Sequence, residues 1–106
     1  MPKYLFEIDY TSGGSEGLLR GGGTSRRKAL EKMMKSAGGK LESLYFTFGI
    51  RDAIAIVELP DNATAAAVSL TVSASGALAM KTTPLLSAAE IDSVTEKAVV
   101  YRPPGN

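Results

Sequence analysis

The sequence predicts an α+β fold, in which one four-stranded sheet carries helices on one face. Residues 4–10 alternate between large apolar and other side chains, the two-residue period of a strand with one buried face. Residues 24–37 instead place their apolar side chains at helical spacing. Further on, two apolar runs over residues 46–57 meet at a Gly-x-x-Asp turn, which is typical of a hairpin. A chain of 106 residues is long enough for one core and one domain.

The first half of the chain is expected to form a strand and an interrupted helical segment. The strand over residues 4–10 ends at Ser12-Gly13-Gly14. Residues 15–20 are expected to form a helical turn, which the three glycines 21–23 then break. The helix over residues 24–37 follows and ends at a Gly-Gly pair, with Met33 and Met34 as core residues.

The second half is expected to hold three strands and two helices. Strands over residues 41–48 and 52–59 form the hairpin, and Asp61 caps a helix that runs to about residue 75. A strand over residues 78–83 ends at Pro84. A last helix begins at the capping box of Ser87 and Glu90.

The order β-α-β-β-α-β, with one more helix, is that of a ferredoxin-like sandwich with two helices on one face of its sheet. We expect residues 1–100 to form this single domain and residues 101–106 a C-terminal tail. The side chains expected beneath the helices are the bulky ones: Tyr4, Phe6, Ile8, Leu44, Phe46, Phe48, Ile54, Ile56 and Met80.

The other face of the sheet is then expected to be open. Its apolar members are Leu5, Tyr45, Ala53, Ala55 and Val57. An open apolar sheet centre favours association, because contiguous apolar patches are rare on monomeric proteins. We therefore expect a second copy of the chain to cover this face, as in dimeric α+β barrels, and a homo-oligomer of two or more subunits.

Composition limits the chemistry. The chain has no histidine and no cysteine, which excludes Ser-His-Asp and Cys-His catalysis, thiolate metal sites and disulfides. We expect no metal ion and no cofactor. Carboxylate, lysine, tyrosine and backbone groups remain for any reaction.

Charge and hydropathy bear on partners and location. Residues 1–51 hold nine Lys/Arg and five Asp/Glu, a net charge of +4, whereas residues 52–106 hold three and six, a net charge of −3. This asymmetry favours self-association or simple solvation, and no aromatic residues interleave with the cations as nucleic-acid binding would favour. Hydroxyl residues interrupt the small-apolar tract 63–79, and the first residues lack a signal-peptide core. We expect a cytoplasmic protein with no membrane partner.

The predicted open face gathers a candidate ligand site: Glu7, Asp9, Tyr45 and Lys81. In this fold the fourth strand neighbours the first, so Lys81 approaches both carboxylates. In a cleft floored by Ala53 and Ala55, a carboxylate could accept a proton while Lys81 stabilises a developing oxyanion. The alternative is a salt-linked, partly solvated interface without chemistry. No residue is assigned a catalytic role.

Two glycine-containing segments are weaker candidates. Residues 21–28 place three glycines before a basic helix start, which suits an anion cradle or, alternatively, a hinge before a solvated basic face. Gly49 is expected to supply a backbone conformation that other residues resist. Asp52 is expected to hydrogen-bond turn amides, with a catalytic role as the alternative.

Several segments together resemble the GYD-domain family, small bacterial proteins named for a glycine-tyrosine-aspartate signature. The likeness runs from Met1 to about Ala98. It is carried by Pro2-Lys3-Tyr4, Gly49 and Asp52, Ile56-Val57-Glu58-Leu59-Pro60-Asp61-Asn62, Ser73-Ala74-Ser75-Gly76, and Lys81-Thr82-Thr83-Pro84. Arg51 stands where the family has its signature tyrosine. The resemblance implies a ferredoxin-like, oligomeric α+β fold and names no activity.

Two hypotheses of function follow. The first is a small-molecule-binding α+β barrel oligomer, either a cofactor-free isomerase or oxygenase-like enzyme or a binder without turnover. The second is a non-catalytic regulatory or interaction module that acts through its oligomer surface and its basic helix. A ligand held between subunits favours the first hypothesis, and a dry interface favours the second.

Overall fold

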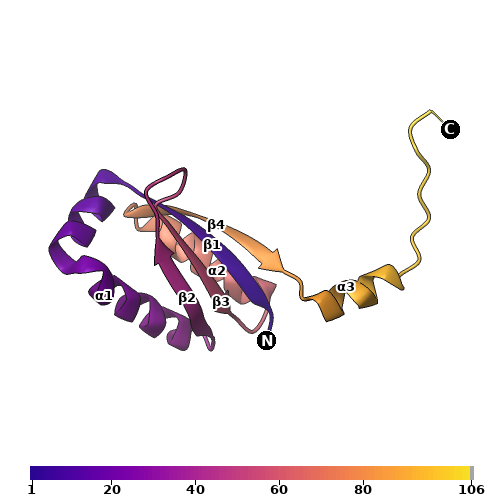
Figure 1. The fold of residues 1–106 in the computed structure, drawn as a ribbon, viewed down its shortest axis with the longest axis horizontal. Coiled ribbons are helices and arrows are strands. Elements are labelled where there is room, and N and C mark those ends of the chain that lie inside the picture. Colours follow the sequence, from indigo (N-terminus) through magenta and orange to yellow (C-terminus); the bar gives the residue numbers. More distant parts are fainter. Residues whose placement is uncertain (106) are drawn as a thin grey trace.

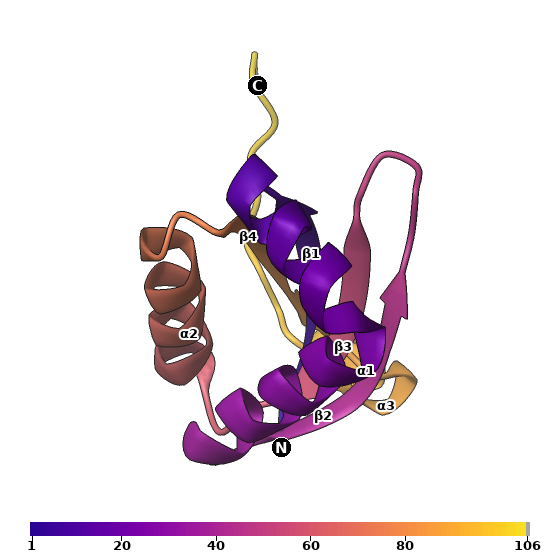
Figure 2. The same ribbon diagram turned by 90° about the vertical axis from the view of Figure 1, so that its left-hand side faces the viewer.

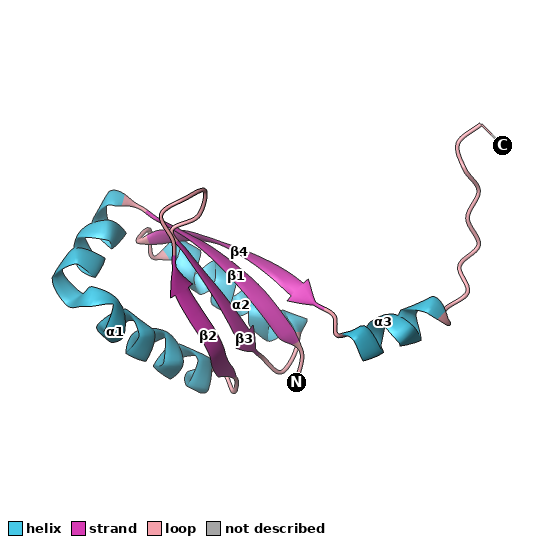
Figure 3. Ribbon diagram, viewed as in Figure 1, coloured by secondary structure: helices cyan, strands magenta, loops and turns pink. Residues whose placement is uncertain are grey.

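Four strands and three helices follow one another in the order β-α-β-β-α-β-α in the computed structural model, which describes residues 1–105 (Figure 1, Figure 3). The strands are β1 (Lys3–Tyr10), β2 (Lys40–Phe46), β3 (Ala53–Glu58) and β4 (Leu78–Leu85). The helices are α1 (Ser12–Ser36), α2 (Asn62–Ala74) and α3 (Ala88–Thr95). The predicted α+β class is confirmed. Asn106 of the predicted tail lies outside the described residues.

All four strands form one antiparallel sheet in the order β2-β3-β1-β4. The first strand is therefore central, and β2 and β4 are the edges. Helices α1 and α2 pack on one face of the sheet, where they share its core, and leave the other face open (Figure 2). This arrangement is consistent with the predicted ferredoxin-like sandwich.

The core lies between the sheet and these two helices. The alternation of β1 places Tyr4, Phe6 and Ile8 in it, as predicted. From the helices come Leu30, Met34, Ala65 and Val68. The Tyr4 hydroxyl donates a hydrogen bond to Asn62 Oδ1 at 2.6 Å, which ties the central strand to the start of α2.

The predicted faces of β3 are wrong. The residues buried beneath the helices are the small ones, Ala53, Ala55 and Val57, whereas Ile54 and Ile56 are half-buried on the open face. The pairing register gives the reason, because Phe6 lies opposite Ala55 and shares its face. Small side chains at the sheet centre leave room for the large ones that β1 and α1 send into the same layer.

Two aromatic residues of the hairpin also lie outside the core in which they were expected. Phe46 is 41% exposed and rests against α1, where a Cβ at Gly23 would be 3.3 Å from its ring. Phe48 is fully exposed at the hairpin tip. Leu44 and Met80 do pack against the core as predicted.

The first helix is longer than predicted. It begins at Ser12, and the side chain of the preceding Thr11 accepts a hydrogen bond from the Gly14 amide at 3.3 Å. The predicted glycine break is a kink at Gly22, whose φ is 78°. The Thr11 amide and hydroxyl both donate to the Ala77 carbonyl, at 3.1 and 2.9 Å, and so fix the helix start to the start of β4.

Two helix N-caps form as predicted, but the fourth strand does not end at the predicted residue. The Asp61 carboxylate accepts from the Thr64 amide at 2.8 Å and begins α2. Ser87 and Glu90 form the full capping box of α3. The fourth strand continues through Pro84 to Leu85, because an edge strand has one side without ladder hydrogen bonds and tolerates a missing N–H there.

Beyond β4 the chain leaves the body of the domain (Figure 1). Residues 86–105, which we call the C-terminal arm, are all exposed, including every residue of α3. The arm makes the molecule 57 Å long and only 33 by 23 Å across, with a radius of gyration of 16.9 Å. A compact chain of this length has a radius of gyration of about 13 Å.

Candidate ligand site on the open face of the sheet

The open face presents its side chains in rows that cross the four strands. One row is Tyr45, Ile54, Glu7 and Lys81, and the next is Ser43, Ile56, Leu5 and Thr83. Neighbouring strands lie roughly 4.8 Å apart, so a row spans roughly 14 Å. Each strand thus contributes one residue to each row. The second row has an apolar centre between polar ends, whereas the first has Glu7 beside Ile54 at its centre.

All four predicted ligand-site residues lie on this face. Glu7 and Lys81 are register partners, and Asp9 lies two residues further along β1. Tyr45 is separated from Glu7 by Ile54 and is largely exposed. The sheet therefore brings both carboxylates and the lysine together, and places the tyrosine at the far end of the row.

The predicted floor of this site is wrong. Ala53 and Ala55 point beneath the helices, and the apolar centre of the open face is Leu5, Ile54 and Ile56. All three are half-buried in the single chain. The floor of the site is therefore more apolar and bulkier than predicted.

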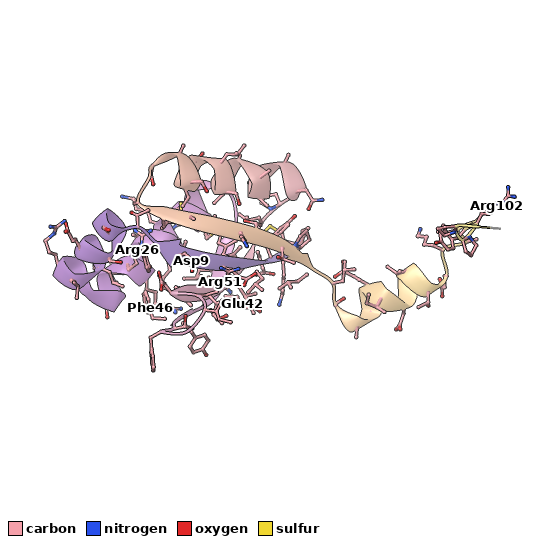
Figure 4. The ribbon with its side chains drawn as sticks, turned by 90° about the horizontal axis from the view of Figure 1, so that it is seen from above. Asp9, Arg26, Glu42, Phe46, Arg51 and Arg102 are labelled. Atoms are coloured by element: carbon pink, nitrogen blue, oxygen red, sulfur yellow. The ribbon has the colours of Figure 1, made fainter. Side chains whose placement is uncertain are left out.

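Arg51 binds both carboxylates. Its Nε donates to Glu7 Oε2 at 3.1 Å and its Nη1 to Asp9 Oδ2 at 2.9 Å. Figure 4 shows Arg51 and Asp9 on the side of the sheet away from α2. The hydrogen bond with Glu7 raises the pKa of the guanidinium, burial opposes this, and the nearby Asp9 charge adds to it. The cluster of Arg51, Glu7 and Asp9 thus carries fixed charges that sum to −1.

The turn between β2 and β3 holds Arg51 in place. The Thr47 hydroxyl donates to the Arg51 carbonyl, and the Thr47 amide donates to the Asp52 carbonyl at 2.8 Å. Asp52 then joins the turn to β1, because its Oδ2 accepts from the Tyr10 amide at 2.8 Å and its amide donates to the Ile8 carbonyl at 3.0 Å. Asp52 therefore has a structural role, and it binds a strand amide instead of the turn amides expected.

Gly49 does not have the conformation that was expected of it. Its φ is not positive, unlike those of Gly22, Gly38, Gly76 and Gly105. A Cβ at Gly49 would meet nothing within 4 Å. The backbone and its surroundings therefore leave Gly49 unconstrained, and the expectation is wrong.

Lys81 lies exposed on edge strand β4. Ion pairs of the described residues join Lys3 to Glu42, Arg27 to Glu31, and Arg51 to its two carboxylates. Lys81 takes part in none of them, although Glu7 is its register partner. Its ammonium group is therefore available to an anionic group from outside the chain.

A hollow lies on the helix side, at the kink of α1. It measures about 270 Å³ and is lined by five glycines of α1, with Tyr10, Ser25 and Arg26 among the polar residues. Of the basic run predicted as an anion cradle, Arg26 lines the hollow, whereas Arg27 pairs with Glu31 at 2.9 Å. The helix bends at this point, as the hinge interpretation requires.

Residues 1–105 lack both of the following features. These residues hold no group of three or more carboxylates placed to bind a metal ion. Within the same span, no helix has both the length and the apolar character needed to cross a membrane.

Sequence reasoning found the carboxylates and the lysine but missed Arg51, Ile54 and Ile56. The signal for Arg51 was its charge, opposite to the two carboxylates on one face of β1. No sequence pattern indicated that the two isoleucines lie on the open face, because β3 is apolar on both faces.

The comparisons with known proteins identify a family and no individual relative. No curated protein and no solved structure matches this chain. A family model for the GYD domain matches residues 4–95, a span that contains β1 from its second residue, β2 to β4, all three helices and every candidate site residue. Because the match covers most of the 106 residues, the chain belongs to the GYD-domain family.

Proposed function

We propose that this protein is a homo-oligomer that binds a small molecule between the open sheet face and a covering second copy. The open face supports this proposal: an apolar centre of Leu5, Ile54 and Ile56 lies beside fixed charges on β1 and the unpaired Lys81. Exposed apolar surface with polar groups beside it is typical of an interaction site. Its ferredoxin-like sheet would then be one half of a dimeric α+β barrel.

The charges suggest the class of ligand. Lys81 offers a cation to an anionic group, and the carboxylates of Glu7 and Asp9 offer their remaining oxygens to a hydrogen-bond donor. Between them, Ile54 offers an apolar floor, and Tyr45 an aromatic side wall with a phenol. We infer a small, partly apolar molecule with a carboxylate or a similar anion at one end, of which benzoate is the simplest representative.

The same geometry favours binding over turnover. Each carboxylate has one oxygen engaged by Arg51, which leaves one oxygen of each free to meet a ligand. A cofactor-free isomerase or oxygenase-like reaction would need Arg51 to release Glu7 or Asp9 once a ligand is bound. By the resemblance described above, Arg51 stands where the family has its signature tyrosine. The ion pairs of Arg51 with Glu7 and Asp9 are therefore a feature of this chain and not of the family signature.

Calorimetric titration of the full-length protein with benzoate tests the proposal. We expect Lys81→Ala to weaken binding by at least about tenfold, because a charge-assisted hydrogen bond of about 1.5–3 kcal/mol is lost. Asp9→Ala should also change the affinity. Lys32→Ala is the matched control, since Lys32 is exposed on α1, on the other side of the sheet. Equal affinities for all variants would place the ligand elsewhere.

The alternative is a non-catalytic interaction module, and the exposed C-terminal arm favours it. In that case the open face would bind its partner without a ligand, and every polar group on it would be satisfied by the second copy. Benzoate would then give no heat at any concentration while the oligomer remained intact. A cytoplasmic location stays a prediction under either function.

A further inference from the structure

The C-terminal arm has an apolar side with nothing on it. Its helix α3 is eight residues long and carries Ile91 and Val94 on one side, 44% and 50% exposed. A helix this short is marginal in water without packing, even with its capping box. Further along the arm, Val99 and Tyr101 are also largely exposed. None of residues 86–105 is buried against the body of the domain.

A second exposed apolar set lies at the other end of the molecule. Phe48 and Ile50 form the tip of the β2–β3 hairpin and are fully or almost fully exposed. The hairpin tip adjoins the Tyr10 end of β1, through Asp52. The arm instead leaves at the opposite end, because Leu85 is the register partner of Lys3.

We propose that the arm of each copy packs its Ile91–Val94 side against the hairpin tip of a second copy, where Phe48 and Ile50 receive it. The two copies are related by a two-fold axis that makes their stacked sheets antiparallel. This inference rests on the proposed oligomer, and it adds the surface, the orientation and the residues that hold the two copies together.

The geometry of the open face supports this orientation. A two-fold axis that lies between the stacked faces and runs across the strands reverses the strand direction of the second copy. It therefore brings the Lys3 end of one sheet over the Tyr10 end of the other. The eight residues of β1 cover about 26 Å at roughly 3.3 Å per residue. The arm of one copy and the hairpin tip of the other therefore both extend past the stacked sheets at the same end.

The start of the arm is continuous with the open face. A hollow of about 590 Å³ lies where the arm begins, between Leu86 and Ser87 of the arm and Lys3 and Ile56 of the sheet. A copy seated on the open face therefore lies alongside the other copy's arm. The arm need not move far from its present course to reach the partner.

Charge favours a second copy over another partner. The arm helix and its end carry Glu90, Asp92 and Glu96. Beside the hairpin, Phe46 rests on Gly23 of α1, and the cations Arg26, Arg27 and Lys28 follow one turn later. The arm's three acidic residues outnumber its two cations, Lys97 and Arg102, and of the three cations on α1 Arg27 is already paired with Glu31. The arm and the part of α1 beside the hairpin therefore carry opposite net charges, in agreement with the +4 and −3 charges of the two halves of the chain.

Engineered cysteines test the proposal cleanly, because the chain has no cysteine of its own. Full-length Phe48→Cys and Val94→Cys are mixed as oligomers, allowed to exchange and oxidised. A disulfide needs Cα atoms within about 7 Å, so we expect the mixture to form a linked dimer and neither variant alone to do so. Leu70→Cys mixed with Val94→Cys is the control, since Leu70 is exposed on α2. Self-linking of Val94→Cys would instead show parallel stacking and overturn the orientation.

A second measurement does not depend on disulfide geometry. In the full chain, Ile91→Ser with Val94→Ser should raise the dimer dissociation constant at least about tenfold, or about 1.4 kcal/mol. Ala89→Ser, a matched serine substitution at an exposed residue on the opposite side of α3, is the control. An unchanged dissociation constant without cross-links would overturn the arm contact while leaving a benzoate-binding dimer, and so the proposed function, intact. A wild-type monomer would overturn both.

Discussion

The close approach of the start of α1 to Ala77, beside β4, gives the sharpest test of the fold. Gly14 and Gly17 lie one turn apart in the glycine-rich first half of the helix, and both have helical backbone. A Cβ at Gly17 would meet nothing within 4 Å. A Cβ at Gly14 would stand 2.0 Å from the Ala77 carbonyl oxygen, well inside the 3.0 Å that real contacts respect. The same substitution by alanine therefore has opposite consequences at the two positions.

The magnitude follows from the contacts that must give way. Alanine gains about 0.5–1 kcal/mol over glycine in a helix at either site. At Gly14 the helix start must also move by about 1 Å, the difference between 2.0 and 3.0 Å, away from Ala77. That shift breaks the bonds from the Thr11 amide and hydroxyl, worth about 0.5–1.5 kcal/mol each. Gly14→Ala should thus be about 1–3 kcal/mol less stable than Gly17→Ala.

Thermal unfolding followed by circular dichroism measures this difference. For a domain near 100 residues, 1 kcal/mol shifts Tm by about 4–8 °C, so the two variants should differ by roughly 5–20 °C. Gly17→Ala should lie at or above the wild-type Tm. If the two variants melted together, the first half of α1 would not be held against β4 as described.

Three further predictions concern the sheet, a cap and the charged cluster. Ala55→Leu should lower the free energy of unfolding by about 1–3 kcal/mol through overpacking, whereas Ala63→Leu, exposed on α2, should change it by less than about 0.5 kcal/mol in urea titrations. Hydrogen bonds from the Thr64 hydroxyl and amide hold the pKa of Asp61 in the folded protein below its usual 3.8. The stability that ionised Asp61 contributes to the fold is therefore fully present above that pH, and it is lost as the pH falls through the lower pKa of the folded protein. Wild type should therefore lose more stability than Asp61→Asn between about pH 5 and 2, and parallel curves would contradict this. Arg51→Gln should lower Tm at low salt, because it leaves two like charges on one face of β1. The difference in Tm from wild type should shrink in about 1 M NaCl, which screens that repulsion. A difference that did not depend on salt would point to lost packing instead.

The sequence was sufficient where one face of an element was polar. The alternation of β1 placed Tyr4 and Phe6 in the core, and the capping box located α3. It was insufficient for β3, because a strand that is apolar on both faces gives no signal about which face is inward. Only the pairing of Phe6 with Ala55 decides that, and pairing is a property of the folded sheet.

The remaining differences have similar causes. The first half of α1 has no apolar stripe, so its helix depends on the Thr11 cap and on contact with Ala77, which lies 66 residues away in the chain. The candidate site was half predicted, because strand residues such as Glu7 take their place from the alternation. Arg51 takes its place from the path of a turn, which the sequence pattern leaves open. The capping box predicted α3, but not that it would stand away from the body.

Native mass spectrometry of the freshly purified full-length protein bears most directly on the covered sheet face. We expect a dimer of about twice the chain's 11.1 kDa, or a higher oligomer, at micromolar concentration, with an added small mass if a ligand is retained. A chain that stays monomeric throughout that range would contradict the account of the open face, and with it both the ligand site and the arm contact.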